Sequence, residues 1–289
     1  MSLPMSLVEA ARKKRPVFTV SAGRSGTKFL AKLLGLFPDT AAHHEPSPSF
    51  VHGMRHAQSN PEAALAFVRD HKLGAIARTP EARYVETSHL FAKGFAEAFI
   101  RLGVVPDVVV LRRHPREIAL SLLRMNSVPA RTGLGVRYLL QPDDPGVLPF
   151  PGWTHATNYQ LCFWYALEME RRQDHYAKVF QHLGSNVVEA QLADLLDFES
   201  FRSLAGGLGF LTTAERDLDR RFDAVAAVKH NSTGRGPVQG ADQDLDAAEA
   251  LVWDRTFFYD ALLFDRVMPR YQDTPRIPDL DEPTAEVPR

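Results

Sequence analysis

Cysteine is almost absent from this sequence, and long apolar runs are missing altogether. Cys162 is the single cysteine among 289 residues, which excludes an internal disulfide framework and the paired-cysteine spacings of zinc sites. No stretch approaches the roughly 18 consecutive apolar residues that a membrane-spanning helix needs, and the first residues lack the apolar core of a signal peptide. We therefore expect a cytoplasmic protein without a membrane span.

An excess of charge of one sign is also lacking, because 34 Lys and Arg residues are balanced by 35 Asp and Glu residues. Broad electrostatic attraction to nucleic acid or to an anionic membrane is therefore not expected. An anionic ligand would instead be bound by a local cluster of donors.

The composition that remains is that of a globular protein, with 45% hydrophobic and 24% charged residues. A chain of this length buries on the order of three quarters of its unfolded surface, so its core needs neither disulfides nor a structural metal. No internal repeat or linker divides the sequence. We predict a single domain over residues 1–270 and an extended tail, rich in proline and acidic residues, over 271–289.

Short apolar runs, each followed by a helical pattern, predict a three-layer α/β fold with a mainly parallel central sheet. Runs such as VVVL at 108–111 are apolar without alternation, which is typical of strands covered on both faces. The predicted strands are 16–20, 83–87, 107–111 and 185–190, and the helices that follow them are 28–37, 91–103, 116–125 and 198–208. Two longer helices are predicted over 158–183 and 245–268.

Residues 126–157 form a Pro/Gly-rich stretch that is too long for an ordinary connection in a compact domain. We predict an insertion that acts as a lid or contacts an acceptor. Its charged and aromatic side chains are the candidates for that contact: Arg131, Arg137, Phe150 and Trp153.

The strongest local signal is the turn after the first predicted strand, SAGRSGTKFL. Gly23 and Gly26 allow backbone angles and a close approach denied to other residues. A helix begins here, so backbone N–H groups and a helix N-terminus converge on one point that attracts anions. The turn also supplies two hydroxyls and two cations, from Ser25, Thr27, Arg24 and Lys28. The pattern favours an anion-binding, P-loop-like strand-loop-helix over a tight connection whose cations are only solvated.

The spacing excludes the common motifs for such turns. A Walker A loop has four residues between its glycines, whereas only Arg24 and Ser25 separate Gly23 from Gly26. The Gly-x-Ser-x-Gly elbow of hydrolases and the GxGxxG loop of dinucleotide-binding proteins are not matched either. A short loop for a phosphate or a sulfate ester remains.

A second cationic segment, LRRHPREIALSLLRM, follows the strand predicted at 107–111. Arg112 and Arg113 stand where a magnesium-dependent phosphotransferase often has an Asp. Pro115 suits the first turn of the next helix. Ser121, taken alone, is best interpreted as a helix serine that bonds back to a carbonyl one turn earlier.

Together, SAGRSGTKFL and RHPREIALS resemble two segments of the sulfotransferase family that uses 3′-phosphoadenosine 5′-phosphosulfate (PAPS), and especially its carbohydrate, tyrosyl-protein and bacterial branches. The first resembles the family's 5′-phosphosulfate loop and the second its 3′-phosphate segment, in the family's order and spacing. The resemblance implies that PAPS is the donor, with the 5′ end held by Gly23, Arg24, Ser25, Gly26, Thr27, Lys28 and Phe29, the 3′ phosphate by Arg113 and Ser121, and a late basic loop provided by Lys229 and Arg235.

Arg24 departs from the family pattern, because many members have lysine at this position. Arginine supplies a fixed positive charge but cannot readily give up a proton. We expect Arg24 and Lys28 to act in catalysis by stabilising the charge that builds on the leaving phosphate.

Transfer to a hydroxyl also needs a proton acceptor, and the segment PDTAAHHEPSPSF offers three. The resemblance selects Glu45 as the base, while His43 or His44 would also serve chemically. Zinc is not expected here, because Pro46 and Pro48 prevent the helix that an HExxH site requires. The proposed chemistry requires no metal.

At the end of the second predicted strand, Glu86, Ser88 and His89 reach the same rim. His89 could orient the acceptor, and for Glu86 we favour a structural role.

The sequence thus predicts a sulfotransferase acting on a small-molecule, carbohydrate or lipid acceptor. Two alternatives are a nucleotide-dependent phosphotransferase with a degenerate loop and a non-catalytic anion-binding protein of the same fold. The sequence does not indicate an oligomeric state.

Overall fold

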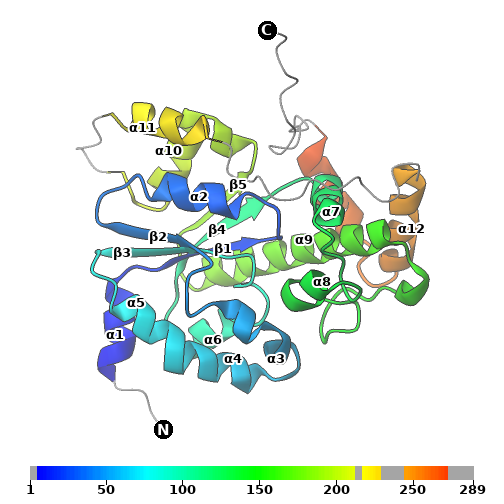
Figure 1. The fold of residues 1–289 in the computed structure, drawn as a ribbon, viewed down its shortest axis with the longest axis horizontal. Coiled ribbons are helices and arrows are strands. Elements are labelled where there is room, and N and C mark those ends of the chain that lie inside the picture. Colours follow the sequence, from blue (N-terminus) through cyan, green and yellow to red (C-terminus); the bar gives the residue numbers. More distant parts are fainter. Residues whose placement is uncertain (1–4, 212–216, 229–243, 273–289) are drawn as a thin grey trace.

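Five short strands form one sheet in the order β2-β3-β1-β4-β5, and every neighbouring pair is parallel (Figure 1). The computed structural model describes residues 5–211, 217–228 and 244–272. Lys229, Arg235 and most of the predicted tail lie outside the described residues. The predicted α/β fold with a parallel central sheet is confirmed. The strands are β1 (Val17–Ser21), β2 (Thr40–His44), β3 (Arg83–Thr87), β4 (Asp107–Arg112) and β5 (Val187–Gln191).

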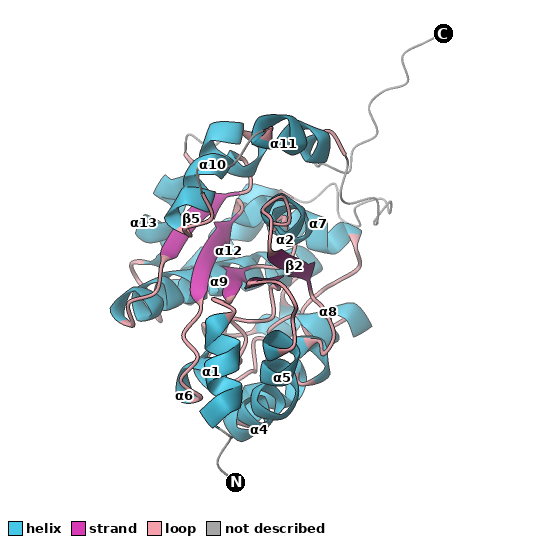
Figure 2. Ribbon diagram, turned by 90° about the vertical axis from the view of Figure 1, so that its left-hand side faces the viewer, coloured by secondary structure: helices cyan, strands magenta, loops and turns pink. Residues whose placement is uncertain are grey.

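Helices cover both faces of this sheet (Figures 1 and 2). Helices α2, α10 and α11 lie on one face, and α1, α5, α6 and α9 on the other. Among the described residues, no helix is both long and apolar enough to cross a membrane. The α-helices are α1 (Met5–Lys13), α2 (Thr27–Leu34), α3 (Met54–Ser59), α4 (Pro61–Phe67), α5 (Leu73–Ala77), α6 (Ala96–Arg101), α7 (Pro115–Arg124), α8 (Gly133–Tyr138), α9 (Asn158–His182), α10 (Phe198–Gly207), α11 (Leu218–Ala226), α12 (Leu245–Phe257) and α13 (Leu263–Val267).

Alternate residues of the central strands enter two separate cores. Val17 and Val109 pack with α2, α10 and α11, whereas Phe18 and Val108 pack with α1, α6 and α9. Successive side chains of a strand point to opposite faces, so a sheet covered on both sides needs apolar residues at every position. This explains the unbroken apolar run of β4.

Helix α9 fixes the carboxyl ends of the two central strands. Its first turn is closed by a capping box in which the Thr157 side chain accepts from the Gln160 N–H and the Gln160 side chain accepts from the Thr157 N–H. Further along, the side-chain amide of Gln173 donates to the carbonyls of Val20 (3.3 Å) and Leu111 (2.7 Å). The ends of β1 and β4 are therefore held next to each other.

Strand β2 was not predicted, because its sequence TAAHH is short and lacks the branched apolar residues typical of strands. It forms an edge strand paired with β3. The segment that holds His43, His44 and Glu45 thus leads directly to the rim of the sheet.

Two predicted helices are shorter in the structure. Of the helix expected over 91–103, only α6 forms, because turns occupy the residues before it and Gly94 has a positive φ of 96°. The helix expected over 245–268 is divided into α12 and α13. The Thr256 hydroxyl bonds to the carbonyls of Val252 and Trp253 at this break, a local bond that competes with helix propagation.

Candidate functional site

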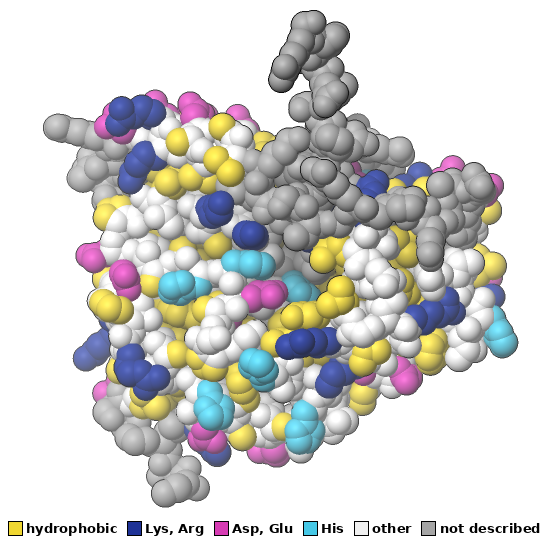
Figure 3. All heavy atoms as spheres, viewed as in Figure 1, with side chains coloured by type: hydrophobic (Ala, Val, Ile, Leu, Met, Phe, Trp, Pro, Cys, Tyr) yellow, Lys and Arg dark blue, Asp and Glu magenta, His cyan; other side chains and the backbone are white. Residues whose placement is uncertain are grey.

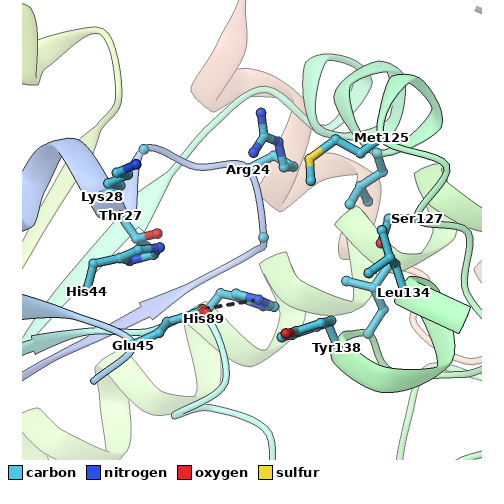
Figure 4. A pocket seen from close by; sticks show the side chains of 14 residues that line it. Arg24, Thr27, Lys28, His44, Glu45, His89, Met125, Ser127, Leu134 and Tyr138 are labelled. Atoms are coloured by element: carbon cyan, nitrogen blue, oxygen red, sulfur yellow. Dashed lines mark ion pairs between the residues drawn. The ribbon is translucent and has the colours of Figure 1, made fainter. Parts of the chain in front are cut away.

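A pocket of about 310 Å³ opens at the carboxyl edge of the sheet (Figure 4). Ligands of open parallel α/β sheets bind at this edge, beyond the strand ends. The loop after β1, the residues after β2 and β3, the end of α7 and helix α8 form its walls. The lining residues are Gly23, Arg24, Gly26, Thr27, Lys28, His44, Glu45, His89, Leu122, Met125, Ser127, Leu134, Tyr138 and Leu139.

The loop between β1 and α2 has the tight geometry that its glycines predict. Arg24 and Gly26 both have left-handed backbone angles, with φ of 71° and 84°. A Cβ atom at Gly26 would lie 2.3 Å from Cδ1 of Leu192, so space as well as conformation requires glycine there. Ser25 is fully buried, and its hydroxyl has no hydrogen-bond partner among the described residues.

This loop is in direct contact with the segment that follows β4. Nε of Arg24 donates to Oγ of Ser121 at 2.9 Å, and Nη1 of Arg113 donates to the backbone carbonyl of Arg24 at 2.9 Å. Nε of Arg113 also binds the carboxylate of Glu117 at 2.9 Å. The two segments that the sequence predicted to hold the two ends of one anionic ligand therefore form one cationic cluster.

Arg112, by contrast, points away from the pocket. Its buried guanidinium pairs with Glu170 at 2.7 Å and with Asp174 at 2.9 Å, both on α9. Of the two arginines at the end of β4, only Arg113 reaches the loop after β1.

Glu45 and His89 face each other across the floor of the pocket (Figure 4). Oε1 of Glu45 lies 3.4 Å from Nε2 of His89, and Glu45 follows β2 with a left-handed φ of 48°. Burial raises the pKa of the Glu45 carboxyl, while the charge of Lys93 opposes this increase. A carboxyl with a raised pKa accepts a proton more readily than an ordinary surface carboxylate.

Lys93, which the sequence analysis did not single out, lies behind this pair and is fully buried. Its Nζ lies 2.8 Å from Nδ1 of His89, 2.7 Å from the carbonyl of Tyr138 and 2.9 Å from the hydroxyl of Tyr165. That hydroxyl also accepts the N–H of Gly23 at 3.1 Å. Burial lowers the pKa of Lys93 well below its usual range. A single lysine inside the apolar run LFAKGFAEAFI was the signal that could have indicated a buried cation.

His44 faces Lys28 and Thr27 on the other side of the pocket (Figure 4). Its Nδ1 lies 2.9 Å from the carbonyl of Thr87, so Nδ1 carries the proton and Nε2 has the free electron pair. Desolvation by the pocket wall lowers the pKa of His44, and the charges of Lys28 and Arg24 lower it further. His43 does not line the pocket.

Glu86 has the structural role that the sequence favoured. Both of its carboxylate oxygens lie 2.9 Å from Nζ of the buried Lys72, and Tyr84 donates to it at 2.5 Å. All three side chains are at least 96% buried, so this group lies beneath the sheet rim and not in the pocket.

The residues chosen within 126–157 do not line the pocket, which corrects the sequence interpretation. The guanidinium of Arg131 binds the side chain of Asn158 and nearby carbonyls, and Phe150 stacks on Trp164. These contacts hold the segment against α9. The pocket is lined instead by four other residues of the segment: Ser127, Leu134, Tyr138 and Leu139.

Phe29, which the resemblance also assigned to the donor, is a residue of α2 whose side chain is buried in the core. Its side chain is not among those lining the pocket. Within residues 5–211, 217–228 and 244–272, no three His, Cys, Asp or Glu side chains are grouped as a metal site would require.

No protein-family model matches the chain, and no curated protein matches it.

Proposed function

We propose that the protein is a PAPS-dependent sulfotransferase that moves the sulfuryl group to a hydroxyl of an acceptor. The observation that carries the proposal is the contact between the two anion-binding segments, through Arg24, Ser121 and Arg113. A ligand with negative charge at both the 5′ and the 3′ position of one ribose needs cations in two neighbouring places. The loop after β1 and the start of α7 offer that pair.

The loop after β1 suits the 5′ phosphosulfate. Lys28 and Arg24 supply charge, the hydroxyl of Thr27 lines the pocket, and the N-terminus of α2 adds backbone donors. The buried Ser25 hydroxyl, which lacks a partner among the described residues, is a further donor for an anion. The residues present therefore fit a phosphosulfate group.

In the proposed reaction, the acceptor oxygen forms a bond to sulfur as the bond between sulfur and the bridging phosphate oxygen breaks. The electron pair leaves with that oxygen, giving adenosine 3′,5′-bisphosphate and a sulfate ester. Glu45 takes the hydroxyl proton, and its raised pKa suits this role. Arg24 and Lys28 stabilise the charge on the leaving phosphate.

His89 orients Glu45 in this scheme. Nζ of Lys93 lies within hydrogen-bond distance of three groups that can accept an N–H, one of which is Nδ1 of His89. When Nδ1 accepts, Nε2 carries the proton and lies 3.4 Å from Oε1 of Glu45. His89 is therefore a positioning residue, and Glu45 is the base.

Thermal unfolding with adenosine 3′,5′-bisphosphate, in the absence of magnesium, tests donor binding. At a hundred times its Kd the ligand should stabilise the fold by about 2.7 kcal/mol. Arg24→Ala and Ser121→Ala should reduce the shift, whereas Lys32→Ala, an exposed lysine of α2 outside the pocket, should not. A larger shift with ATP and magnesium would favour the phosphotransferase alternative.

Catalysis is tested with Glu45→Gln in the same protein. We expect unchanged bisphosphate affinity, together with a loss of product formation of roughly 10² to 10⁴-fold, the usual contribution of a general base. Sulfated products are detected by mass spectrometry after incubation with PAPS and a pooled metabolite extract. Bisphosphate binding without any product would support the non-catalytic alternative.

A further inference from the structure

The pocket has two unlike walls (Figures 3 and 4). The wall built by the loop after β1 and the ends of β2 and β3 carries the cations, the histidines and Glu45. The facing wall comes from the end of α7, the turn after it, and α8. Among the described residues this second wall contributes no charged side chain, and its members are Leu122, Met125, Ser127, Leu134, Tyr138 and Leu139.

Charged side chains are present in the same segment, but they do not line the pocket. Arg131 is bound to Asn158 and to backbone carbonyls at the start of α9. The guanidinium of Arg137 lies over the ring of Tyr138, 5.4 Å from its centre, and is not part of the pocket lining. The apolar character of this wall is therefore a consequence of how α8 is oriented, and not of a lack of polar residues nearby.

Helix α8 places Leu134 in the pocket although this side chain is 45% exposed. Large apolar side chains exposed at the mouth of a cavity are typical of surfaces that bind an apolar partner. Val136, on the same helix, is 39% exposed and does not line the pocket. Leu134 and Val136 are therefore similarly exposed residues of one helix, but only Leu134 lines the pocket.

An apolar wall selects against carbohydrates. A sugar carries hydroxyls around its whole ring, and each one buried without a partner costs binding energy. An acceptor with a hydrocarbon body loses nothing when that body lies on Met125 and Leu134, provided that its hydroxyl points at the opposite wall. The pocket volume of about 310 Å³ includes the space beside the loop after β1, where the phosphosulfate would lie, so the space left for the acceptor is small.

We propose that the acceptor is a small alcohol or phenol whose hydroxyl is carried by an apolar body. The body lies along Leu134, Met125 and the ring of Tyr138, and the hydroxyl is directed at Glu45. This inference rests on the proposed sulfuryl transfer for the fate of the hydroxyl. The apolar body is bound by side chains that take no part in the transfer, so its binding can be measured without turnover.

The test uses 2-naphthol as the probe and a methyl glycoside of N-acetylglucosamine as the contrasting ligand, with binding measured by saturation-transfer NMR and by naphthol fluorescence. We expect 2-naphthol to bind and the glycoside neither to bind nor to compete. Leu134→Asp should weaken naphthol binding by at least about tenfold, because a carboxylate then faces the hydrocarbon. Val136→Asp should change it by less than about twofold.

Both variants should keep the thermal shift with adenosine 3′,5′-bisphosphate, which shows that they are folded and that the donor side is intact. Binding of the glycoside in place of naphthol, an absence of naphthol binding, or equal losses in the two variants would overturn the inference. Transfer from PAPS to the glycoside alone would overturn it while leaving the sulfotransferase proposal standing. Naphthol binding without sulfation by PAPS would instead support the acceptor pocket and contradict the transfer.

Discussion

At the scale of single residues, Lys93 connects parts of the site that are far apart in the sequence. Its Nζ contacts His89 after β3, the Tyr138 carbonyl on α8 and the Tyr165 hydroxyl on α9. Through Tyr165 it is linked to the N–H of Gly23 in the loop after β1. One buried side chain therefore connects the loop after β1, His89 and helix α8.

His89 gives a prediction about stability and pH. Burial lowers the pKa of His89 well below its usual value, and the charge of Lys93 adds to the effect. As pH falls below about 6.5, the unfolded chain binds a proton at this histidine and the folded chain does not, so stability decreases on the acid side. Between roughly pH 7.5 and pH 5.5, the free energy of unfolding of the wild type should fall by about 1 kcal/mol more than that of His89→Gln.

Melting temperatures measured across that pH range for the two proteins test this difference. Glutamine is polar but does not titrate in this pH range, so the comparison isolates the missing titration. The raised pKa of Glu45 acts in the opposite direction, because its folded form binds protons more readily, and it is present in both proteins. Parallel curves for the two proteins would contradict the lowered pKa of His89.

At the scale of secondary structure, α8 depends on one glycine. A Cβ atom at Gly135 would lie 1.8 Å from the carbonyl oxygen of Val128, a backbone atom that cannot move aside. Gly135→Ala should therefore shift α8 and destabilise the fold by roughly 1–3 kcal/mol, the usual cost of overpacking. Gly133→Ala, at the start of the same helix with open space around it, is the matched control and should be nearly neutral.

Chemical unfolding of both variants measures this effect, and naphthol binding shows whether the apolar wall moves with α8. Equal stability of the two variants would show that the segment around Val128 adjusts freely.

Elements with strong local signals could be predicted from the sequence. Pro115 marks the start of α7, and the glycine turn marks the junction of β1 and α2. The contact between these two places could be expected only because parallel strands end at one edge of a sheet. The apolar wall could not be predicted, because Leu134 and Val136 look alike in sequence and only the orientation of α8 separates them. Lys93 was missed for a related reason, since periodicity does not identify which polar side chain a turn directs inward.

At the scale of the whole molecule, a buried ionic network joins the central sheet to the last described turn, η5 (Met268–Tyr271). Arg112 at the end of β4 and Arg270 in η5 bind the same two carboxylates of α9, those of Glu170 and Asp174. Tyr271 is 95% buried and donates to Glu170. The folded unit therefore extends past residue 270, the boundary predicted from the sequence, at least as far as Tyr271.

Removing Arg112 should affect the entire fold, because the buried carboxylates of Glu170 and Asp174 would lose their closest buried cation and keep only partners from the C-terminal elements, namely Arg266, Arg270 and Tyr271. Breaking a buried ion pair by deleting one partner costs about 3–5 kcal/mol, so Arg112→Met should lower the melting temperature by roughly 10 °C. Arg202→Met is the control, because its pair with Glu199 is exposed and such pairs contribute about 0–1 kcal/mol.

Since Arg112 fixes the strand end that positions Arg113, Arg112→Met should also weaken bisphosphate binding, which calorimetry can measure. A normal melting temperature for Arg112→Met would mean that η5 and α9 hold the carboxylates without the sheet.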